Sequence, residues 1–290
     1  MNIGVIGLGQ MGGAISSNLL KTGFHVSGYD ILPKMLDHLA KNGGAPLGSV
    51  QAIANACDLI ILSIPSADSL FDVTSKIIKS GRADIIVLEI STLKVEDKHK
   101  AHDQLSAANI TLMDIPMSGT GVQAKSGDLV YFASGERLAF KIAKPVLEAF
   151  CKDGYYLGCF GNGSRMKFVA NLLVAIHNVA AGEALTLAQK SGLNPEQALK
   201  VIGASAATSK MLEIRGPTML SKAYGDGGIA LNLFQKDISI IREFAKDLGV
   251  ITPLFETSSK IYDQAMNEGH AEDDTACVCA VLERMAGIGC

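Results

Sequence analysis

The 290-residue sequence predicts an α/β protein of two domains, in which a parallel sheet with helices on both faces precedes an all-α domain. Three observations predict this fold class. The chain is longer than a usual single domain. Short apolar runs alternate with amphipathic stretches in its first half, and no strand pattern returns after Gly163. The predicted domains are residues 1–162 and residues 163–290.

The first domain reads as strands and helices in alternation. A strand, a helix and another strand in sequence are typical of parallel pairing with crossover helices. The expected strands are Ile3–Gly7, His25–Asp30, Asp58–Ile64, Asp84–Ile90, Ile110–Ile115, Gly127–Ser134 and Tyr155–Gly158. The expected helices are residues 11–22, 33–42, 67–80 and 94–107 and Arg137–Phe150.

The second domain begins with a long helical run, Ser164–Lys190, which ends at a glycine stop in Ser191-Gly192. Asn194-Pro195 then opens another helix, as a cap followed by proline in the first turn. The uncharged part of the long run, Phe168–Gly182, is shorter than the roughly 20 apolar residues that cross a membrane, so a buried helix is expected. The remaining expected helices are residues 231–248, 253–268 and 275–285.

Composition excludes several classes of protein. The chain has 26 Lys and Arg residues and 29 Asp and Glu residues, which gives a net charge of −3. This mild acidity argues against binding to nucleic acid or to an anionic membrane surface. Six scattered cysteines without C-x-x-C spacing, the last of them Cys290, predict reduced thiols and no metal site. The N-terminus lacks a signal-peptide pattern, so a cytoplasmic location is expected.

A glycine-rich motif follows the first predicted strand and opens the first helix: Gly7-Leu8-Gly9-Gln10-Met11-Gly12. Gly7 permits the tight turn, Gly9 lets the backbone approach a pyrophosphate, and Gly12 lets the helix pack against the strand. The helix N-terminus, with Gln10 and Met11, presents amide donors to the anion. In this context the motif predicts a Rossmann-like dinucleotide site.

Asp30 stands at the tip of the second predicted strand, 18 residues after Gly12. A carboxylate there accepts hydrogen bonds from the adenosine ribose hydroxyls and repels a 2′-phosphate. No arginine follows it, so NAD is favoured over NADP. Pro65 and Ser66 end another strand at the same sheet edge, where they are expected to line the cofactor site.

Three further segments, taken with this motif, resemble the β-hydroxyacid dehydrogenase family, which includes 3-hydroxyisobutyrate, tartronate semialdehyde and threonate dehydrogenases. They are Asp114-Ile-Pro-Met-Ser-Gly119, Gly163-Ser-Arg-Met-Lys167-Phe-Val-Ala-Asn171 and Lys236-Asp237 with the run after it. They stand in the family's order and spacing, and the resemblance covers nearly the whole chain. It is specific for the family but does not indicate which substrate is used.

The resemblance implies roles for individual residues. Ser118 and Gly119 would hold the substrate carboxylate, Lys167 would be the general acid/base, and Asn171 would orient the substrate or the lysine. Family members often have Ser-Gly-Gly where this chain has Thr120 as the third residue. Thr120 therefore adds a branched hydroxyl side chain beside the carboxylate site and puts the usual small-acid substrates in question.

Two more positions are carried over from the resemblance. Thr92 matches the position near the nicotinamide ribose, and Lys236 lies near the cofactor in the family. Independently of the family, Lys167, Asn171 and Asn178 fall on one stripe of the expected helix, inside a run that is otherwise uncharged. Because burying an unpaired ammonium is costly, Lys167 is expected to face a polar cleft. The alternative is an ordinary exposed lysine near a helix start.

The favoured function is hydride transfer between NAD and a small 3-hydroxy acid, or reduction of the matching semialdehyde. An imine reductase-like enzyme on the same fold is one alternative, although such relatives usually lack the lysine. A decarboxylating phosphogluconate-type dehydrogenase would have histidine at the position of Ala170. A non-catalytic NAD-binding sensor is the alternative from another class.

A homodimer or homotetramer is also expected. The long helix is apolar around much of its circumference, so it needs cover on several sides, and one small helical domain supplies little. The family resemblance points the same way. The apolar residues are Leu172, Leu173, Val174, Ile176, Val179 and Leu185.

Overall fold

A computed structural model describes residues 1–225 and 228–288 of the chain. Two compact units make up the fold, Met1–Lys167 and Phe168–Cys290. The first combines sheets and helices, and the second is helical in its described part. The predicted class, an α/β domain followed by an all-α domain, is confirmed. The boundary between residues 162 and 163 stays a prediction, and Cys290 lies outside the described residues.

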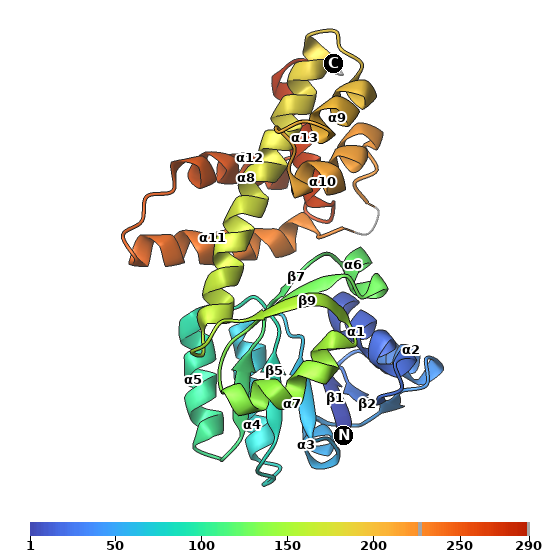
Figure 1. Ribbon diagram of the computed structural model, residues 1–290, viewed down its shortest axis with the longest axis vertical. Helices are drawn as coiled ribbons and strands as arrows, with labels where there is room; N and C mark the ends of the chain where they lie inside the picture. Colours follow the sequence, from blue (N-terminus) through green and yellow to red (C-terminus); the bar gives the residue numbers. More distant parts are fainter. Residues whose placement is uncertain (226–227, 289–290) are drawn as a thin grey trace. The chain divides into compact units, whose positions relative to one another are not determined.

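A six-stranded parallel sheet forms the centre of the first unit, in the order β3-β2-β1-β4-β5-β6 (Figure 1). The helices α1 to α5 connect these strands. The strands are β1 (Asn2–Ile6), β2 (His25–Tyr29), β3 (Ala45–Pro46), β4 (Leu59–Leu62), β5 (Ile86–Glu89) and β6 (Thr111–Asp114). The helices are α1 (Gln10–Lys21), α2 (Pro33–Lys41), α3 (Val50–Ala56), α4 (Ala67–Ile78) and α5 (Val95–Ser106).

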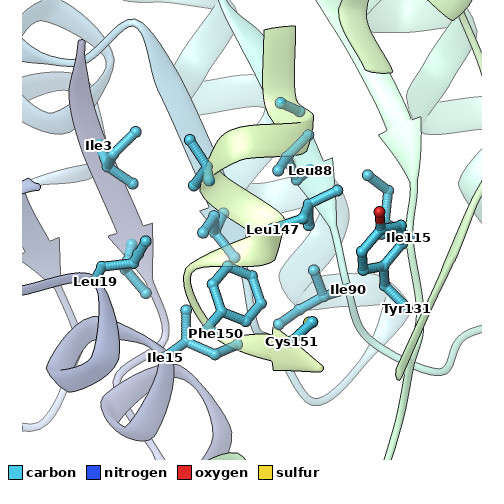
Figure 2. Close-up of a cluster of buried hydrophobic side chains, with 14 of the residues drawn as sticks. Ile3, Ile15, Leu19, Leu88, Ile90, Ile115, Tyr131, Leu147, Phe150 and Cys151 are labelled. Carbon is cyan, nitrogen blue, oxygen red and sulfur yellow. The ribbon is translucent and has the colours of Figure 1, made fainter. Parts of the chain in front are cut away.

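Apolar side chains cover both faces of this sheet, which is why its central strands are almost purely hydrophobic. All four residues of β4 are buried. One core cluster joins the sheet to α1 and to α7 (Arg137–Glu148), and Figure 2 shows Ile15, Leu88 and Leu147 among its side chains. The other joins the opposite face to α3, α4 and α5.

A second sheet of three strands lies beside the first in the same unit. It contains β7 (Met117–Ser118), β8 (Leu129–Ala133) and β9 (Cys151–Tyr156), with β7 antiparallel and β9 parallel to β8. The strands expected near 127–134 and 155–158 are β8 and the end of β9. The sequence reading missed β3, β7, α3 and the short helix α6 (Gly121–Ser126) because each is too short to show a period.

The second unit packs helices around α8 (Asn162–Lys190), whose first six residues belong to the first unit. The others are α9 (Pro195–Gly203), α10 (Lys210–Ser221), α11 (Leu231–Asp247), α12 (Pro253–Asn267), the short η1 (Thr275–Cys277) and α13 (Val278–Met285). The sequence reading missed α10, which contains Pro217, a residue that normally breaks a helix interior.

By length and composition α8 could cross a membrane, a property that core helices of soluble proteins share. One side of it is buried within the second unit. Ala175, Val179 and Leu185 are at most 5% exposed. Asn178, at 1% exposure, donates hydrogen bonds to the Tyr262 hydroxyl and to the Thr275 carbonyl. These two hydrogen bonds hold this part of α8 inside the second unit.

We expect Gly12→Ala to destabilise the first unit. A Cβ built on Gly12 would lie 1.9 Å from the carbonyl oxygen of Gly7, which is backbone and cannot swing away. Overpacking of this kind costs about 3 kcal/mol. The matched control is Gly203→Ala, a helical glycine whose Cβ would meet no heavy atom of the described chain within 4 Å. Calorimetric melting should show a lowered transition for Gly12→Ala alone, and equal melting of both variants would contradict the packing argument.

Candidate active site

The loop between β1 and α1 has the geometry of an anion cradle. Gly7 has φ +87°, and a Cβ there would lie 2.0 Å from the Ser63 carbonyl oxygen. By contrast, a Cβ on Gly9 would meet no heavy atom of the described chain within 4 Å, so the backbone at Gly9 is open. Gly9 is also the N-cap of α1, without a side-chain hydrogen bond to the first turn. The amides of Gln10 and Met11 are therefore directed at a site that a phosphate fits.

Asp30 follows β2 and is tied directly to this loop. One carboxylate oxygen accepts the backbone N–H of Leu8 at 2.7 Å, and the other accepts that of Leu32 at 2.9 Å. Each oxygen has a second lone pair, so the carboxylate can still accept ribose hydroxyls. The hydrogen bonds from Leu8 and Leu32 fix the carboxylate beside the phosphate loop, where a dinucleotide requires it.

The next two strands bring the other predicted cofactor residues to the same sheet edge. Pro65 and Ser66 follow β4, and Thr92 follows β5, the neighbouring strand. The Ile64 N–H donates to the Ser91 hydroxyl at 2.9 Å, which joins the two turns. The Ser66 hydroxyl itself caps α4 by accepting the Ser69 N–H, so its side chain has a structural role as well.

The segment Ser118–Thr120 turns from β7 into α6. Gly119 has φ +141°, and a Cβ there would meet Leu129 at 2.6 Å, so glycine is required. Thr120 is the N-cap of α6: its hydroxyl accepts the Gln123 N–H, and the Gln123 side chain accepts the Thr120 N–H at 2.9 Å. The sequence T-x-x-Q is a capping-box signature that could have revealed this helix.

The capping role changes the interpretation of Thr120. Thr120 is 8% exposed, and its hydroxyl accepts a backbone N–H of α6. Its main role in the structure is therefore to cap that helix. The loop is also anchored to α1, because Asn18 donates to the Ala124 carbonyl at 2.7 Å. A Cβ on Gly121 would lie 2.3 Å from the Gln10 side chain. These contacts set Ser118 and Gly119 close to the start of α1.

The first turns of α8 carry Lys167 and, one turn later, Asn171. Lys167 is 8% exposed and Asn171 5% exposed, which excludes the alternative of an ordinary surface lysine. Asn171 donates to a carboxylate oxygen of Asp237 at 3.0 Å, and Lys236 lies 3.4 Å from the other oxygen. The second unit therefore joins Asn171 and Lys236 through Asp237, which the sequence reading quoted in a motif but did not assign to the site.

A buried ion cluster, which the sequence reading missed, lies at the ends of β5 and β6. Glu89 and Asp114 are directly paired across these strands, and Lys98 of α5 lies 2.5 Å from Glu89 and 2.8 Å from Asp114. All three side chains are fully buried. Burial alone would lower the pKa of Lys98, but the carboxylates of Asp114 and Glu89 outweigh it and hold that pKa above its ordinary value.

One signal in the sequence could have revealed the cluster. Lys98 shares a helical stripe with Val95, Ala101 and Leu105, which all face the core. A lysine on such a stripe needs a buried partner. Among the described residues, no group of three His, Cys, Asp or Glu side chains is arranged to hold a metal ion.

Comparison with known proteins agrees with this geometry. Residues 2–160 match the NAD binding domain of 6-phosphogluconate dehydrogenase, and residues 161–282 match the domain described as NAD-binding of NADP-dependent 3-hydroxyisobutyrate dehydrogenase. The chain is 31% identical to L-threonate dehydrogenase of Cupriavidus necator, over 96% of this chain and 95% of that one.

Solved structures extend the comparison. A 3-hydroxyisobutyrate dehydrogenase from Salmonella typhimurium aligns with a TM-score of 0.88 at 28% identity, over 97% of this chain and 99% of that one. An imine reductase from Bacillus cereus aligns with a TM-score of 0.63 at 20% identity, over 97% and 99% of the two chains, which shows a shared fold alone. The expectation of an NAD-dependent hydroxyacid dehydrogenase is confirmed at the level of the family. The chain belongs to the β-hydroxyacid dehydrogenase family.

Proposed function

We propose that this enzyme oxidises a small 3-hydroxy acid with NAD, or reduces the matching semialdehyde, with Lys167 as the general acid/base. The observation that carries the proposal is the burial of Lys167 at the start of α8, one turn before Asn171. A lysine amine kept out of bulk water is suited to exchange a proton with a bound oxygen. The resemblance of the chain to L-threonate and 3-hydroxyisobutyrate dehydrogenases supports the substrate class.

The residues of the first unit account for cofactor binding. Gly7–Gly12 and the start of α1 would hold the pyrophosphate, and Asp30 would accept the ribose hydroxyls. Pro65, Ser66 and Thr92 would line the nicotinamide half, and Lys236 of the second unit would also lie near the cofactor. When bound, NAD supplies the acceptor for the hydride.

The remaining residues account for the substrate. The Ser118 hydroxyl and the Gly119 amide would hold the carboxylate, with Thr120 keeping the turn in place. Lys167 would take the proton from the hydroxyl during oxidation and return it during reduction. The Asn171 amide group donates to Asp237, which leaves its carbonyl oxygen to orient the Lys167 ammonium or the substrate hydroxyl.

Two alternatives are distinguished by assay. An imine reductase-like enzyme would reduce a cyclic imine and ignore hydroxy acids, and an NAD-binding sensor would bind the cofactor without turnover. The buried lysine favours the dehydrogenase over both. Oxidation of C3 to C5 hydroxy acids with NAD and NADP, followed by absorbance of the reduced cofactor, tests the dehydrogenase. Reduction of a cyclic imine and a cofactor-binding titration, carried out alongside, separate the two alternatives.

We also propose a homodimer or homotetramer in the cytoplasm. An apolar groove runs along the end of α8 and α9 in the second unit, lined by Leu187, Leu193 and Val201 among others. These three side chains are 72%, 62% and 61% exposed. A contiguous exposed apolar surface of this kind is typical of a protein interface.

Lys167→Ala should lower kcat by about 10²–10⁴, because general acid–base catalysis contributes that much. Affinity for NADH, measured by fluorescence titration, should change little, since the proton moves only in the chemical step. Lys167→Arg should fail as well, because a guanidinium stays protonated and has another shape. An alanine variant that kept more than about a third of the wild-type kcat would remove Lys167 from the mechanism.

The wild-type enzyme should prefer NAD, measured as the ratio of kcat/KM for NAD and NADP. Asp30→Ala combined with Ile31→Arg should move that ratio about tenfold or more toward NADP, since a repulsive charge is replaced by an attractive one. Ile31 is 83% exposed, so Ile31→Arg alone is the control and should change the ratio less. A wild-type enzyme that preferred NADP would contradict the assigned role of Asp30.

Light scattering at micromolar concentration should give a mass of at least twice the 30.5 kDa of one chain. Leu193→Lys should shift the protein toward monomer, because it places a charge in the apolar groove. Leu248→Lys is the matched control, as Leu248 is also 62% exposed but lies outside the groove. A wild-type monomer, or equal masses for both variants, would speak against the groove as the interface.

A further inference from the structure

The buried ammonium of Lys98 lies among three acceptors at the carboxyl edge of the parallel sheet. It lies 2.5 Å from the Glu89 carboxylate and donates to the Asp114 carboxylate at 2.8 Å and to the Ser91 carbonyl at 2.7 Å. Ser91 in turn accepts the Ile64 N–H on its hydroxyl and donates its own N–H to Glu89. The cluster thus connects the ends of the three adjacent strands β4, β5 and β6.

Asp114 continues this network into the first turn of α8. Its Oδ1 accepts the Ser164 hydroxyl at 2.7 Å, and its Oδ2 accepts the Ser164 N–H at 2.8 Å. The Ser134 hydroxyl also donates to Oδ2, at 3.1 Å, and accepts the Gly163 N–H at 2.9 Å. Asp114 and Ser134 are fully buried and Ser164 is 1% exposed, so water does not compete for these bonds.

The position of Asp114 suits a capping charge. A carboxylate at a helix N-terminus is stabilised by the unpaired amides and by the helix dipole. Two carboxylates around one ammonium would leave a buried negative charge. The Ser164 amide compensates it directly, and the Gly163 amide does so through the Ser134 hydroxyl. Because a buried ion cluster adds little net stability compared with apolar packing, a role in fixing geometry is the better explanation.

We propose that Asp114, held by Lys98, is a positioning residue that fixes the first turn of α8 through Ser164 and thereby places Lys167 for proton transfer. Lys167 comes three residues after Ser164, one turn along the same helix. The proposal rests on the assigned role of Lys167. A misplacement of about 1 Å is enough to cost a large part of a catalytic rate, so the bonds to Ser164 bear directly on turnover.

Ser164→Ala is the first test, since it removes one hydroxyl without leaving a buried charge unpaired. Asp114→Asn is the second, because it keeps the shape of the side chain but loses the charge. The matched control is Ser259→Ala in α12, where a fully buried hydroxyl donates to the Phe255 carbonyl. Hydrogen exchange of residues 161–168, kcat, NADH affinity and melting temperature are measured for each variant.

Ser164→Ala should raise hydrogen exchange at the start of α8 and lower kcat, each about tenfold, while NADH affinity changes less than about twofold. Its melting temperature should fall no further than that of Ser259→Ala, whose kcat should stay near wild type. Asp114→Asn should have the larger effect. In the double variant, Ser164→Ala with Asp114→Asn, kcat should fall by a smaller factor than the product of the two single factors. The reason is that both residues act through one contact.

Several results would overturn the proposal. A wild-type kcat in Ser164→Ala would do so, as would unchanged hydrogen exchange at residues 161–168. A third such result is a kcat that falls in proportion to the melting temperature, to the same degree in Ser164→Ala and in Ser259→Ala. If Lys167→Ala is inactive while Ser164→Ala has full kcat, the positioning role fails and the proposed function stands. If Lys167→Ala is active, the proposed function fails and the positioning role fails with it.

Discussion

The first unit depends on one buried charge, the ammonium of Lys98. It pairs with two carboxylates at the ends of neighbouring strands. It also donates a hydrogen bond to the turn that follows β5, at the Ser91 carbonyl. Without it, Glu89 and Asp114 would be like charges paired across β5 and β6 in an apolar core, which is costly. The arrangement is stable because every member of the cluster has a partner of opposite charge or a hydrogen-bond donor.

The parallel arrangement of the strands explains why the Lys98 ammonium lies at the sheet edge where the active site is expected. All six strands of the main sheet end at one edge, so the loops after β1, β2, β4, β5 and β6 gather there. Gly7, Asp30, Pro65 and Thr92 each follow a different strand. The sheet interior is apolar and needs no such side chains. Polar residues are therefore placed at that edge, where ligands bind in open parallel sheets.

Thr120, a predicted site residue, has a structural role in the capping of a helix. In the sequence it stands out as a branched residue beside the expected carboxylate site. In the structure its hydroxyl caps α6, and α6 packs against α1 through the bond from Asn18 to Ala124. The residue that differs from the family's frequent glycine thus holds the end of the turn of Ser118 and Gly119 to the first turn of α6. Its effect on substrate choice would then act through the position of that turn.

The sequence by itself determined the fold class, the family and most of the cofactor loop. These rest on local signals: alternating apolar runs, a glycine motif between a strand and a helix, and Asp30 at the next strand tip. That Lys167 and Asn171 share one helix face was also predictable, because they are four residues apart. Short elements such as β3, β7 and α6 were not, since a few residues show no period.

Only the tertiary structure decided which charges meet. Glu89, Lys98 and Asp114 lie on three separate elements. The helical stripe of Lys98 indicates that this lysine needs a buried partner, but the local sequence does not show which carboxylates meet it. The same holds for Asp237, whose partner Asn171 is 66 residues away in the chain. Such contacts depend on strand order and helix packing, which are set by the burial of the whole core. A sequence motif identifies the residues of a site, and the long-range packing of buried polar groups decides how those residues are held.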